Sequence, residues 1–531
     1  MVASGSEKLK IVGLTVQAAA LQARLKAALK KVVKLKEANH LLLAENQLLR
    51  DEVARLKGQK GKPKIGPSRL TKGDKPPRPK RQKGEEKSAR APDHTKIIKA
   101  TDVPEGSTFK GYADYTVQEL RIEAMTTLYR AQKWLTPEGR TITAELPAEA
   151  AKGHFGPTLR SFILYQYYHA MVTEPLLLEA LREWGVSISS GQLHNLITAG
   201  KDQFHQEKDE ILRVGLQVSK HIHADDTGAR HQGKNGYATN IGNDLFAWFE
   251  TTSSKSRINF LGLLRAGRTD FVLSGMALKY MASQALPKHA LKKLADVGDQ
   301  AFATESEWKA ALQSWGITDE RQVRIATEGA LLGSVLAQGL NPDLAIISDD
   351  AGQFNVLLHG LCWIHAERIL AKLVGFDAEC HTALEQVRTT LWELYRDLKV
   401  YKLAPTADAK VLLENRFDDL CKTKTCFISL NLALQRMARN KRELLLVLAR
   451  PDVPLHNNAS EGDVREFVKR RKISGGTRNE DGRRARDTFA SLKKTCRKLG
   501  ISFWNYLNDR LLGAGKIPSL PALIETRAQA P

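Results

Sequence analysis

Cysteine is scarce in this sequence. Its 531 residues include five cysteines, which are scattered and never form a Cys-x-x-Cys pair. This excludes a disulfide-rich scaffold and a zinc ribbon, and it predicts a reduced, cytoplasmic protein. Long hydrophobic runs are lacking as well, since none approaches the ~20 residues of a membrane-spanning helix. The first residues lack the charged start and apolar core of a signal peptide, so we expect no secretion.

Acidic residues are in the minority. Lys and Arg number 81 against 59 for Asp and Glu, which gives a net charge of +22. This surplus favours a polyanionic partner. The length predicts two to four domains, and an apolar content of 42% is enough to build their cores.

Apolar residues repeat every seven positions near the N-terminus. One series is Leu21, Ala28, Leu35, Leu42, Leu49 and Leu56, and a second, four residues later, is Leu25, Val32, Asn39, Asn46 and Val53. Two such series over five heptads predict a coiled coil within residues 1–57. Asn39 and Asn46 favour a parallel, in-register dimer, so we expect a homo-oligomer. A single amphipathic helix packed on its own domain is the alternative.

A basic, proline-rich stretch follows at residues 58–94. It has too few apolar residues to form a core, so we expect a disordered linker that either binds phosphates or is only solvated. Residues 95–215 are predicted to form a mostly helical DNA-binding region. The expected elements are short strands at 112–117 and 141–144 and helices at 158–170, 174–184 and 190–197. The last two helices, with Gly185 between them, have the spacing of a helix-turn-helix, although an ordinary helical hairpin shows the same pattern.

Two predicted strands lead into pairs of carboxylates. The first reaches Asp225 and Asp226, and the second reaches Asp349 and Asp350. Two more predicted strands and a helix follow the first pair, at 236–241, at 245–251 and from about Ser256. Three strands and then a helix, with an acid on the first strand, are typical of the opening of a ribonuclease-H-like core.

Glu461 stands at the start of a third notable segment. Together with Arg465, Lys469 and Lys472 it is spaced by four, four and three residues, so these side chains share one helix face. One carboxylate followed by three cations suits a position beside a metal ion and a phosphate backbone. The basic residues around and after it are expected to contact phosphates or to form a solvated helix face: Arg470, Arg471, Lys472, Arg478, Arg483, Arg484, Arg486, Lys493, Lys494, Arg497 and Lys498.

Carboxylates that converge from separate elements are typical of two-metal phosphodiester chemistry. Two divalent ions roughly 3.5–4 Å apart bind the attacking and leaving oxygens in line. Oxygen ligands select Mg²⁺, with Mn²⁺ able to substitute, over zinc. A single acid at a strand end is usually a cap or a turn former, so the prediction depends on both pairs and the glutamate helix together.

The segment 457–465 resembles the C-terminal signature of the insertion-sequence-66 family of bacterial transposases. The shared features are the Asn457-Asn458 pair, Glu461 three residues on, Arg465 four residues after it, and an Arg-Lys pair downstream.

Two further segments resemble the same family. Residues 224–227 are similar to its Ala-Asp-Glu-Thr, with Asp226 in place of the usual Glu. Asp349 has an aromatic residue, Phe354, five positions later, and residues 362–368 match Cys-Trp-x-His-x-x-Arg.

The resemblance implies an α/β fold with a ribonuclease-H-like core at residues 216–510, helical insertions near 268–325 and 372–450, and a tail at 511–531. It implies a DDE transposase with Asp225, Asp349 and Glu461 as the catalytic, metal-binding triad. The residues expected to bind DNA are Arg368, Arg465, Lys469, Arg471 and Lys472, and those expected to support the site are Asp226, Asp350, Asn457, Asn458, Cys362 and His365. Accessory proteins of the same mobile element are further partners that the resemblance allows.

Two alternatives stay open. One is a catalytically inactive DNA-binding protein derived from such a transposase, and the other is a nuclease on the same core that does not transpose. Related transposases often carry a Cys-rich zinc motif after the linker, whereas residues 58–361 contain no cysteine. A DNA-binding subdomain in that region would therefore work without zinc.

Overall fold

The computed structural model describes residues 31, 93–147, 153–341, 343–375 and 377–529. The chain divides into two compact units, residues 1–116 and 117–531. Apart from residue 31, the predicted coiled coil lies outside the described residues, and so does nearly all of the predicted basic linker.

The described residues 93–147 contain little regular structure. They include β1 (Lys133–Leu135) and β2 (Thr141–Thr143), which form an antiparallel pair. The predicted strand at 141–144 is confirmed, whereas the one at 112–117 is wrong. Its alternating residues have no partner strand in the described part of the chain, and their large side chains are exposed.

Helices dominate from residue 157 to residue 218. They are α3 (Pro157–Leu164), the π-helix η2 (Tyr165–His169), α4 (Glu174–Glu183), α5 (Ser190–Thr198) and α6 (Asp202–Val218). The three helices predicted in this region are confirmed. A capping box between Ser189 and Gln192 begins α5, and Gly185 turns the chain after α4 with a φ of +86°. The two-helix geometry is therefore present, and its use in reading DNA stays a prediction.

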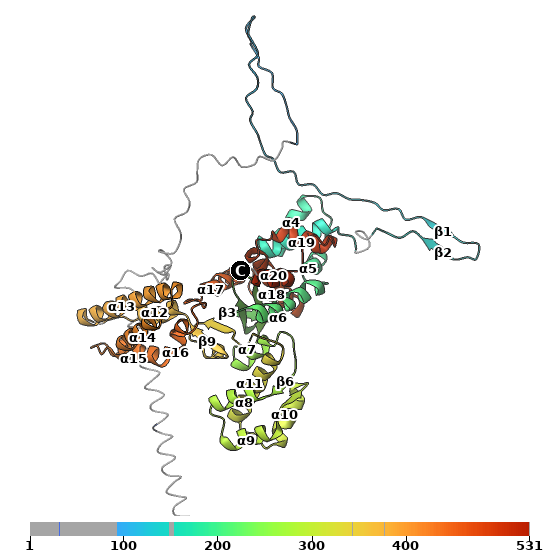
Figure 1. Cartoon of the computed structure of the whole chain (residues 1–531). Coiled ribbons are helices and arrows are strands. Elements are labelled where there is room, and N and C mark those ends of the chain that lie inside the picture. Colours follow the sequence, from blue (N-terminus) through green and yellow to red (C-terminus); the bar gives the residue numbers. More distant parts are fainter. Residues whose placement is uncertain (1–30, 32–92, 148–152, 342, 376, 530–531) are drawn as a thin grey trace, which may run out of the picture. The chain divides into compact units, whose positions relative to one another are not determined.

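A five-stranded mixed sheet is central to the second unit (Figure 1). Its order is β5-β4-β3-β8-β9, with β3 (His221–His231), β4 (Lys234–Gly242), β5 (Ala247–Thr252), β8 (Ala345–Ser348) and β9 (Leu358–Leu361). β3, β4 and β5 are antiparallel neighbours, whereas β8 and β9 run parallel to β3. β8 is buried along its whole length, as is typical of a parallel strand covered on both faces. The predicted α/β class is confirmed.

β3 is longer than the sequence predicted. It passes through both carboxylates and ends at His231, where Gln232 and Gly233 form a two-residue hairpin turn into β4. Both turn residues have a positive φ, of 49° and 75°, as a type I′ turn requires. The pairing with β8 stops at His223, so Asp225 still lies beyond the parallel part of the strand.

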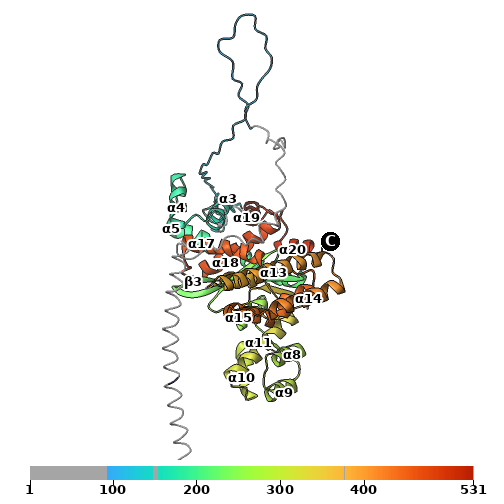
Figure 2. The ribbon, with the colours of Figure 1, turned by 90° about the vertical axis from the view of Figure 1, so that its left-hand side faces the viewer.

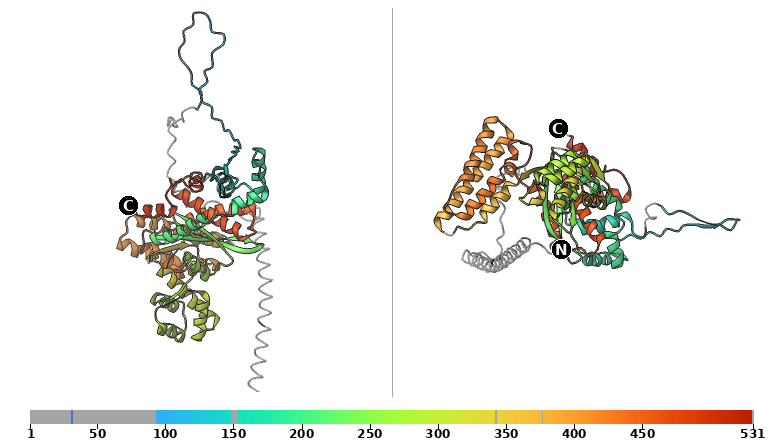
Figure 3. Two further views of the ribbon diagram at one scale, coloured as in Figure 1. Left: turned by 90° about the vertical axis from the view of Figure 1, so that its right-hand side faces the viewer. Right: turned by 90° about the horizontal axis from the view of Figure 1, so that it is seen from below.

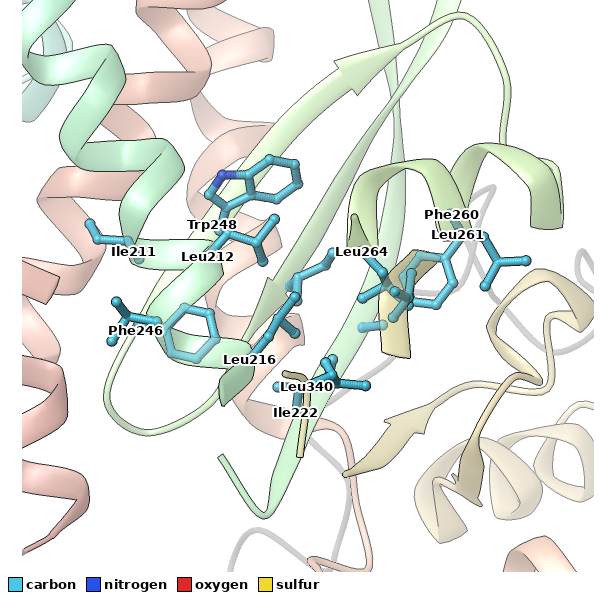
Figure 4. Close-up of a cluster of buried hydrophobic side chains, with 14 of the residues drawn as sticks. Ile211, Leu212, Leu216, Ile222, Phe246, Trp248, Phe260, Leu261, Leu264 and Leu340 are labelled. Atoms are coloured by element: carbon cyan, nitrogen blue, oxygen red, sulfur yellow. The ribbon is translucent and has the colours of Figure 1, made fainter. Parts of the chain in front are cut away.

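A hydrophobic core joins the sheet to its helices (Figure 4). Side chains from α6, from β5 and the residue before it, and from α7 (Arg257–Leu264) contribute to it: Ile211, Leu212, Leu216, Phe246, Trp248, Phe260, Leu261 and Leu264. Gly215 allows α6 to approach the sheet closely, because a Cβ there would lie 2.6 Å from the Phe246 ring.

The first insertion lies between α7 and β8. It contains β6 (Phe271–Leu273), α8 (Gly275–Ser283), α9 (Lys288–Val297), β7 (Gln300–Phe302), α10 (Glu305–Ser314) and α11 (Glu320–Ala337). Helices α8, α9 and α10 gather in one group (Figure 2). Helix α11 packs against α7. The insertion was predicted to be helical, but β6 and β7 pair as a small sheet. Phe271 and Phe302 hold these strands on the buried Trp308, with ring centroids 6.0 and 5.3 Å away.

The second insertion is helical, as predicted. After the 3₁₀ turn η3 (Gly352–Phe354), β9 and α12 (Trp363–Ala371) come α13 (Ala378–Leu403), α14 (Ala407–Lys422), α15 (Ile428–Arg439), α16 (Lys441–Leu444) and the 3₁₀ turn η4 (Leu446–Leu448). Figure 3 shows α13, α14 and α15 lying side by side.

The chain closes with four helices: α17 (Asn458–Ser474), α18 (Glu480–Lys498), α19 (Phe503–Leu512) and α20 (Leu520–Ala528). The segment predicted as a tail is therefore part of the fold, because Leu520 and Ile524 of α20 are buried in the core and α20 packs on α6. Among the described helices, none combines the length and the apolar character that crossing a membrane requires.

Candidate active site

Strand register brings the first two predicted acids together. His223 of β3 pairs in parallel with Ile347 of β8. Asp225 and Asp349 each follow two residues later, so continuing the register places them at the same level and on the same face of the sheet.

The surroundings of Asp225 and Asp349 leave their charge uncompensated. Asp225 Oδ1 accepts a 2.8 Å hydrogen bond from the N–H of Asp226, and Asp349 Oδ1 accepts one of 3.1 Å from Ala351. Neither carboxylate forms an ion pair with any described residue. Burial raises the pKa of Asp225 to about 7, and the charges of Asp349 and Glu461 add to the effect.

The adjacent acids, Asp226 and Asp350, are held by neighbouring side chains instead. Asp226 accepts hydrogen bonds from the Thr239 hydroxyl at 2.6 Å and from Gln353 Nε2 at 2.9 Å. Asp350 Oδ2 accepts from Arg436 Nε at 2.6 Å and from Asn440 Nδ2 at 3.0 Å. Within each pair, one carboxylate is thus committed to the fold and the other is open.

Glu461 lies on the first turn of α17, and both its oxygens are occupied. Arg368 of α12 donates from Nη1 to Oε1 at 2.7 Å and from Nη2 to Oε2 at 3.1 Å. Arg465 Nη2 is 3.3 Å from Oε2, and His365 Nε2 is 3.7 Å from Oε1. Burial opposes ionisation of Glu461, but the hydrogen bonds and charge of Arg368 outweigh it and lower the pKa.

Asn457 connects the strand that carries Asp225 with the helix that carries Glu461. Its fully buried side chain donates to the Ala224 carbonyl at 2.9 Å and lies 2.9 Å from His223 Nδ1, both on β3. Its backbone N–H donates to Cys362 Sγ at 3.2 Å, and its carbonyl accepts from the N–H of Glu461 at 3.1 Å. This one residue therefore fixes α17 against both β3 and the start of α12.

Cys362 and His365 lie beside this junction. Cys362 is buried, and burial raises the pKa of its thiol to about 11, so it is a packing and hydrogen-bonding group here. Burial lowers the pKa of His365, although the charge of Glu461 acts in the opposite direction. Asn458 begins α17 one residue after the junction.

The predicted DNA-binding residues have different surroundings. Arg465, Lys469 and Lys472 are exposed on α17. Arg471 is half-buried, with Nη1 3.4 Å from Thr227 Oγ1, and Arg368 is paired with Glu461.

Most cations of α18 point into the protein. Lys494 Nζ lies 2.7 Å from Glu466, and Lys498 Nζ lies 2.8 Å from Asp463, while the buried Lys493 also pairs with Glu466. Arg483 is 2.7 Å from Glu250 on β5, and Asp487 is buried beneath it, accepting from Thr251. The expectation that this basic run contacts phosphates is therefore wrong for Arg483, Lys493, Lys494 and Lys498, which neutralise acids inside the fold.

Sequence reasoning missed several residues around the acids. Thr239 was within reach of prediction, because the hairpin turn at 232–233 sets Asp226 opposite it. Gln353, Arg436 and the contact of Arg368 with Glu461 carry no local signal, since each partner is 86 or more positions away.

The donor chemistry fits a divalent cation in part. Asp225 and Asp349 are two neighbouring, uncompensated carboxylates, the oxygen ligands that Mg²⁺ prefers. In the described residues, however, no three His, Cys, Asp or Glu side chains gather closely enough to hold a metal ion. Both oxygens of Glu461 accept hydrogen bonds from Arg368.

Two comparisons with known proteins identify the family of the chain. Residues 346–485 match the family described as Transposase IS66 family, a range that includes Asp349, Arg368 and Glu461 but not Asp225. The uncharacterized protein y4jO of Sinorhizobium fredii (strain NBRC 101917 / NGR234) is 43% identical over 321 residues, which cover 60% of this chain and 100% of that protein. The resemblance noted in the sequence is thus confirmed, and the chain belongs to the IS66 family of transposases.

Proposed function

We propose that this chain is the DNA transposase of a bacterial insertion sequence. It would bind the terminal inverted repeats of the element, hydrolyse a phosphodiester at each end, and join the resulting 3′-hydroxyls to target DNA. The observation that carries the proposal is the strand register that sets Asp225 beside Asp349, with Glu461 on the helix that Asn457 ties to the same strand.

The sheet supports a ribonuclease-H-like core. Three antiparallel strands, β3 to β5, are followed after an insertion by two parallel strands, β8 and β9, on the other side of β3. Asp225 lies on the central strand of this order, and Asp349 directly follows its parallel neighbour.

The proposal gives each of these residues a role. Asp225 and Asp349 would hold Mg²⁺ or Mn²⁺, and Glu461 would complete the ligand set. When bound, the divalent ions supply an activated water or 3′-hydroxyl and stabilise the leaving oxygen. Arg465, Lys469 and Lys472 are exposed on α17, where they can bind the phosphate backbone on either side of the scissile bond. Homo-oligomerisation through residues 14–57 would bring two element ends together.

The test is Mg²⁺-dependent cleavage of a labelled duplex that carries the ends of the element encoding the chain. Glu461→Gln keeps the shape of the side chain but removes a metal ligand. Since loss of groups that only support metal ligands costs about 10–100-fold, we expect loss of a ligand to reduce cleavage by more than ~100-fold. Glu525→Gln, on the exposed face of α20, is the matched control and should cleave like the wild type.

Equal cleavage by wild type and Glu461→Gln would overturn the assignment of Glu461. No cleavage by either, with DNA binding intact, would favour the inactive DNA-binding alternative. Cleavage without joining to target DNA would favour a nuclease that does not transpose.

A further inference from the structure

Arg368 forms an ion pair with Glu461, the proposed third metal ligand. The side chains are 25% and 13% exposed, and the guanidinium binds the two carboxylate oxygens in parallel. Those are the same oxygens that a divalent ion would need.

Positive charge is distributed unevenly around the three acids. Glu461 has the cations Arg368 and Arg465 within 3.3 Å, whereas Asp225 and Asp349 pair with no cation among the described residues. A divalent ion at Asp225 and Asp349 would therefore find its third ligand already neutralised by Arg368, whose guanidinium occupies both oxygens of Glu461.

A phosphate group is a suitable competitor for that guanidinium. Arg binds phosphate in the same two-point geometry with which it binds carboxylate. Arg368 is partly exposed, and α17, which carries Glu461, also displays the exposed Arg465 and Lys469. A DNA backbone attracted to these cations would reach the side of the site on which Arg368 lies.

We propose that Arg368 is a positioning residue that keeps Glu461 from the metal until a DNA phosphate takes over the guanidinium. The proposal rests on the proposed function, since it presumes that Glu461 is a metal ligand. In this proposal, the contact between Arg368 and Glu461 couples DNA binding to completion of the metal site. In the absence of DNA, the site would hold a divalent ion through Asp225 and Asp349 alone, and weakly.

The test measures Mn²⁺ binding to the full-length chain by electron paramagnetic resonance, without DNA and with an excess of duplex. Arg368→Met keeps much of the length of the side chain but removes its charge. Because partners of metal ligands typically change metal affinity by about 10–100-fold, we expect Arg368→Met to bind Mn²⁺ at least ~10-fold more tightly than the wild type without DNA. Duplex should tighten binding to the wild type and leave Arg368→Met unchanged.

Two further variants make the result specific. The double variant Arg368→Met, Glu461→Gln should lose the gain, because the gain is made through the glutamate. Arg510→Met breaks another two-point pair, with Glu207 at 3.0 and 3.1 Å on α6, and should bind Mn²⁺ like the wild type. If Arg368→Met does not fold, as judged by circular dichroism, Arg368→Lys replaces it and should show a smaller gain in the same direction.

The outcomes distinguish the two proposals. Wild-type Mn²⁺ binding that Asp225→Asn abolishes, but that Arg368→Met leaves unchanged, would keep the proposed function and overturn the role of Arg368. Absence of Mn²⁺ binding in every variant, with and without duplex, would overturn the proposed function itself.

Discussion

Helices α17 and α18 are both rich in lysine and arginine, and they place these side chains in opposite surroundings. On α17, Arg465, Lys469 and Lys472 face solvent. On α18, Lys493 and Lys494 are buried and pair with Glu466 of α17. The net charge of the chain therefore overstates the positive charge on its surface, because part of that charge neutralises internal acids.

The acids around α17 show the same contrast. Glu466 is surrounded by cations, and although burial opposes its ionisation, Lys493 and Lys494 lower its pKa to about 2. Asp225 lacks such partners, and burial with the neighbouring acids raises its pKa to about 7. The Glu466 carboxylate therefore stabilises the fold. Ionisation of Asp225 destabilises it, and a bound cation would remove that destabilisation.

Removal of Glu466 should have the largest effect on stability. Glu466→Gln leaves the buried Lys493 without its carboxylate partner and Lys494 with only Asp463, 3.5 Å away, so we expect the free energy of unfolding to fall by about 3–5 kcal/mol. Chemical denaturation measures it. Glu210→Gln is the matched control, since its pair with Arg213 is exposed and should cost less than about 1 kcal/mol. Equal effects of the two substitutions would contradict the contrast between buried and exposed pairs.

Lowering the pH should remove the stabilisation that the ionised Glu466 provides. Because the folded-state pKa of Glu466 lies near 2, below its usual value of 4.5, the native state binds fewer protons than the unfolded chain between these values. The stabilisation is complete above about pH 5 and is lost as the pH falls toward 2, on the order of 2–3 kcal/mol. Unfolding midpoints measured from pH 6 to pH 3 should fall less steeply for Glu466→Gln than for the wild type.

Asp225 should respond in the opposite sense. Because its pKa is raised in the native state, the free energy of unfolding falls as the pH rises from about 4 to 7. In metal-free buffer at pH 8, Asp225→Asn should therefore raise the free energy of unfolding by about 1–3 kcal/mol, which is part of the roughly 4 kcal/mol that raising the pKa from 3.8 to about 7 represents. A less stable variant under these conditions would show that Asp225 is not an uncompensated charge.

The exposed lysines should have the smallest effect on stability. Lys469→Gln with Lys472→Gln should change the free energy of unfolding by less than about 0.5 kcal/mol. If both lysines contact phosphates, the plot of log affinity for DNA against log salt concentration should become shallower, its negative slope shrinking in magnitude by about 2. Lys493→Met is the converse control, because it should destabilise the fold and leave that slope unchanged.

The local elements of this fold were largely within reach of sequence patterns. The strands that carry Asp225 and Asp349 were predicted from apolar runs that lead into acids, and the helix of Glu461 from the spacing of its charges. The length of β3 was misjudged because Gln232 and Gly233, rather than the acids, turn the chain.

Contacts between side chains that are far apart in the sequence could not be predicted from it. The inward direction of Lys493 and Lys494 depends on how α18 packs on α17 and β5, and a basic helix facing solvent has the same composition. The occupation of Glu461 by Arg368, 93 positions earlier in the chain, depends on where α12 lies relative to α17. No pattern within one segment encodes that placement.

The junction at Asn457 also determines when the site can exist during synthesis. Asn457 joins residues 233 and 95 positions earlier in the chain, and α20, among the last residues described, covers α6. A nascent chain on the ribosome therefore carries Asp225 and Asp349 long before it has the helix that brings Glu461 to them. Contacts of such separation also form slowly. A truncated translation product that ends before α17 would therefore contain Asp225 and Asp349 without Glu461.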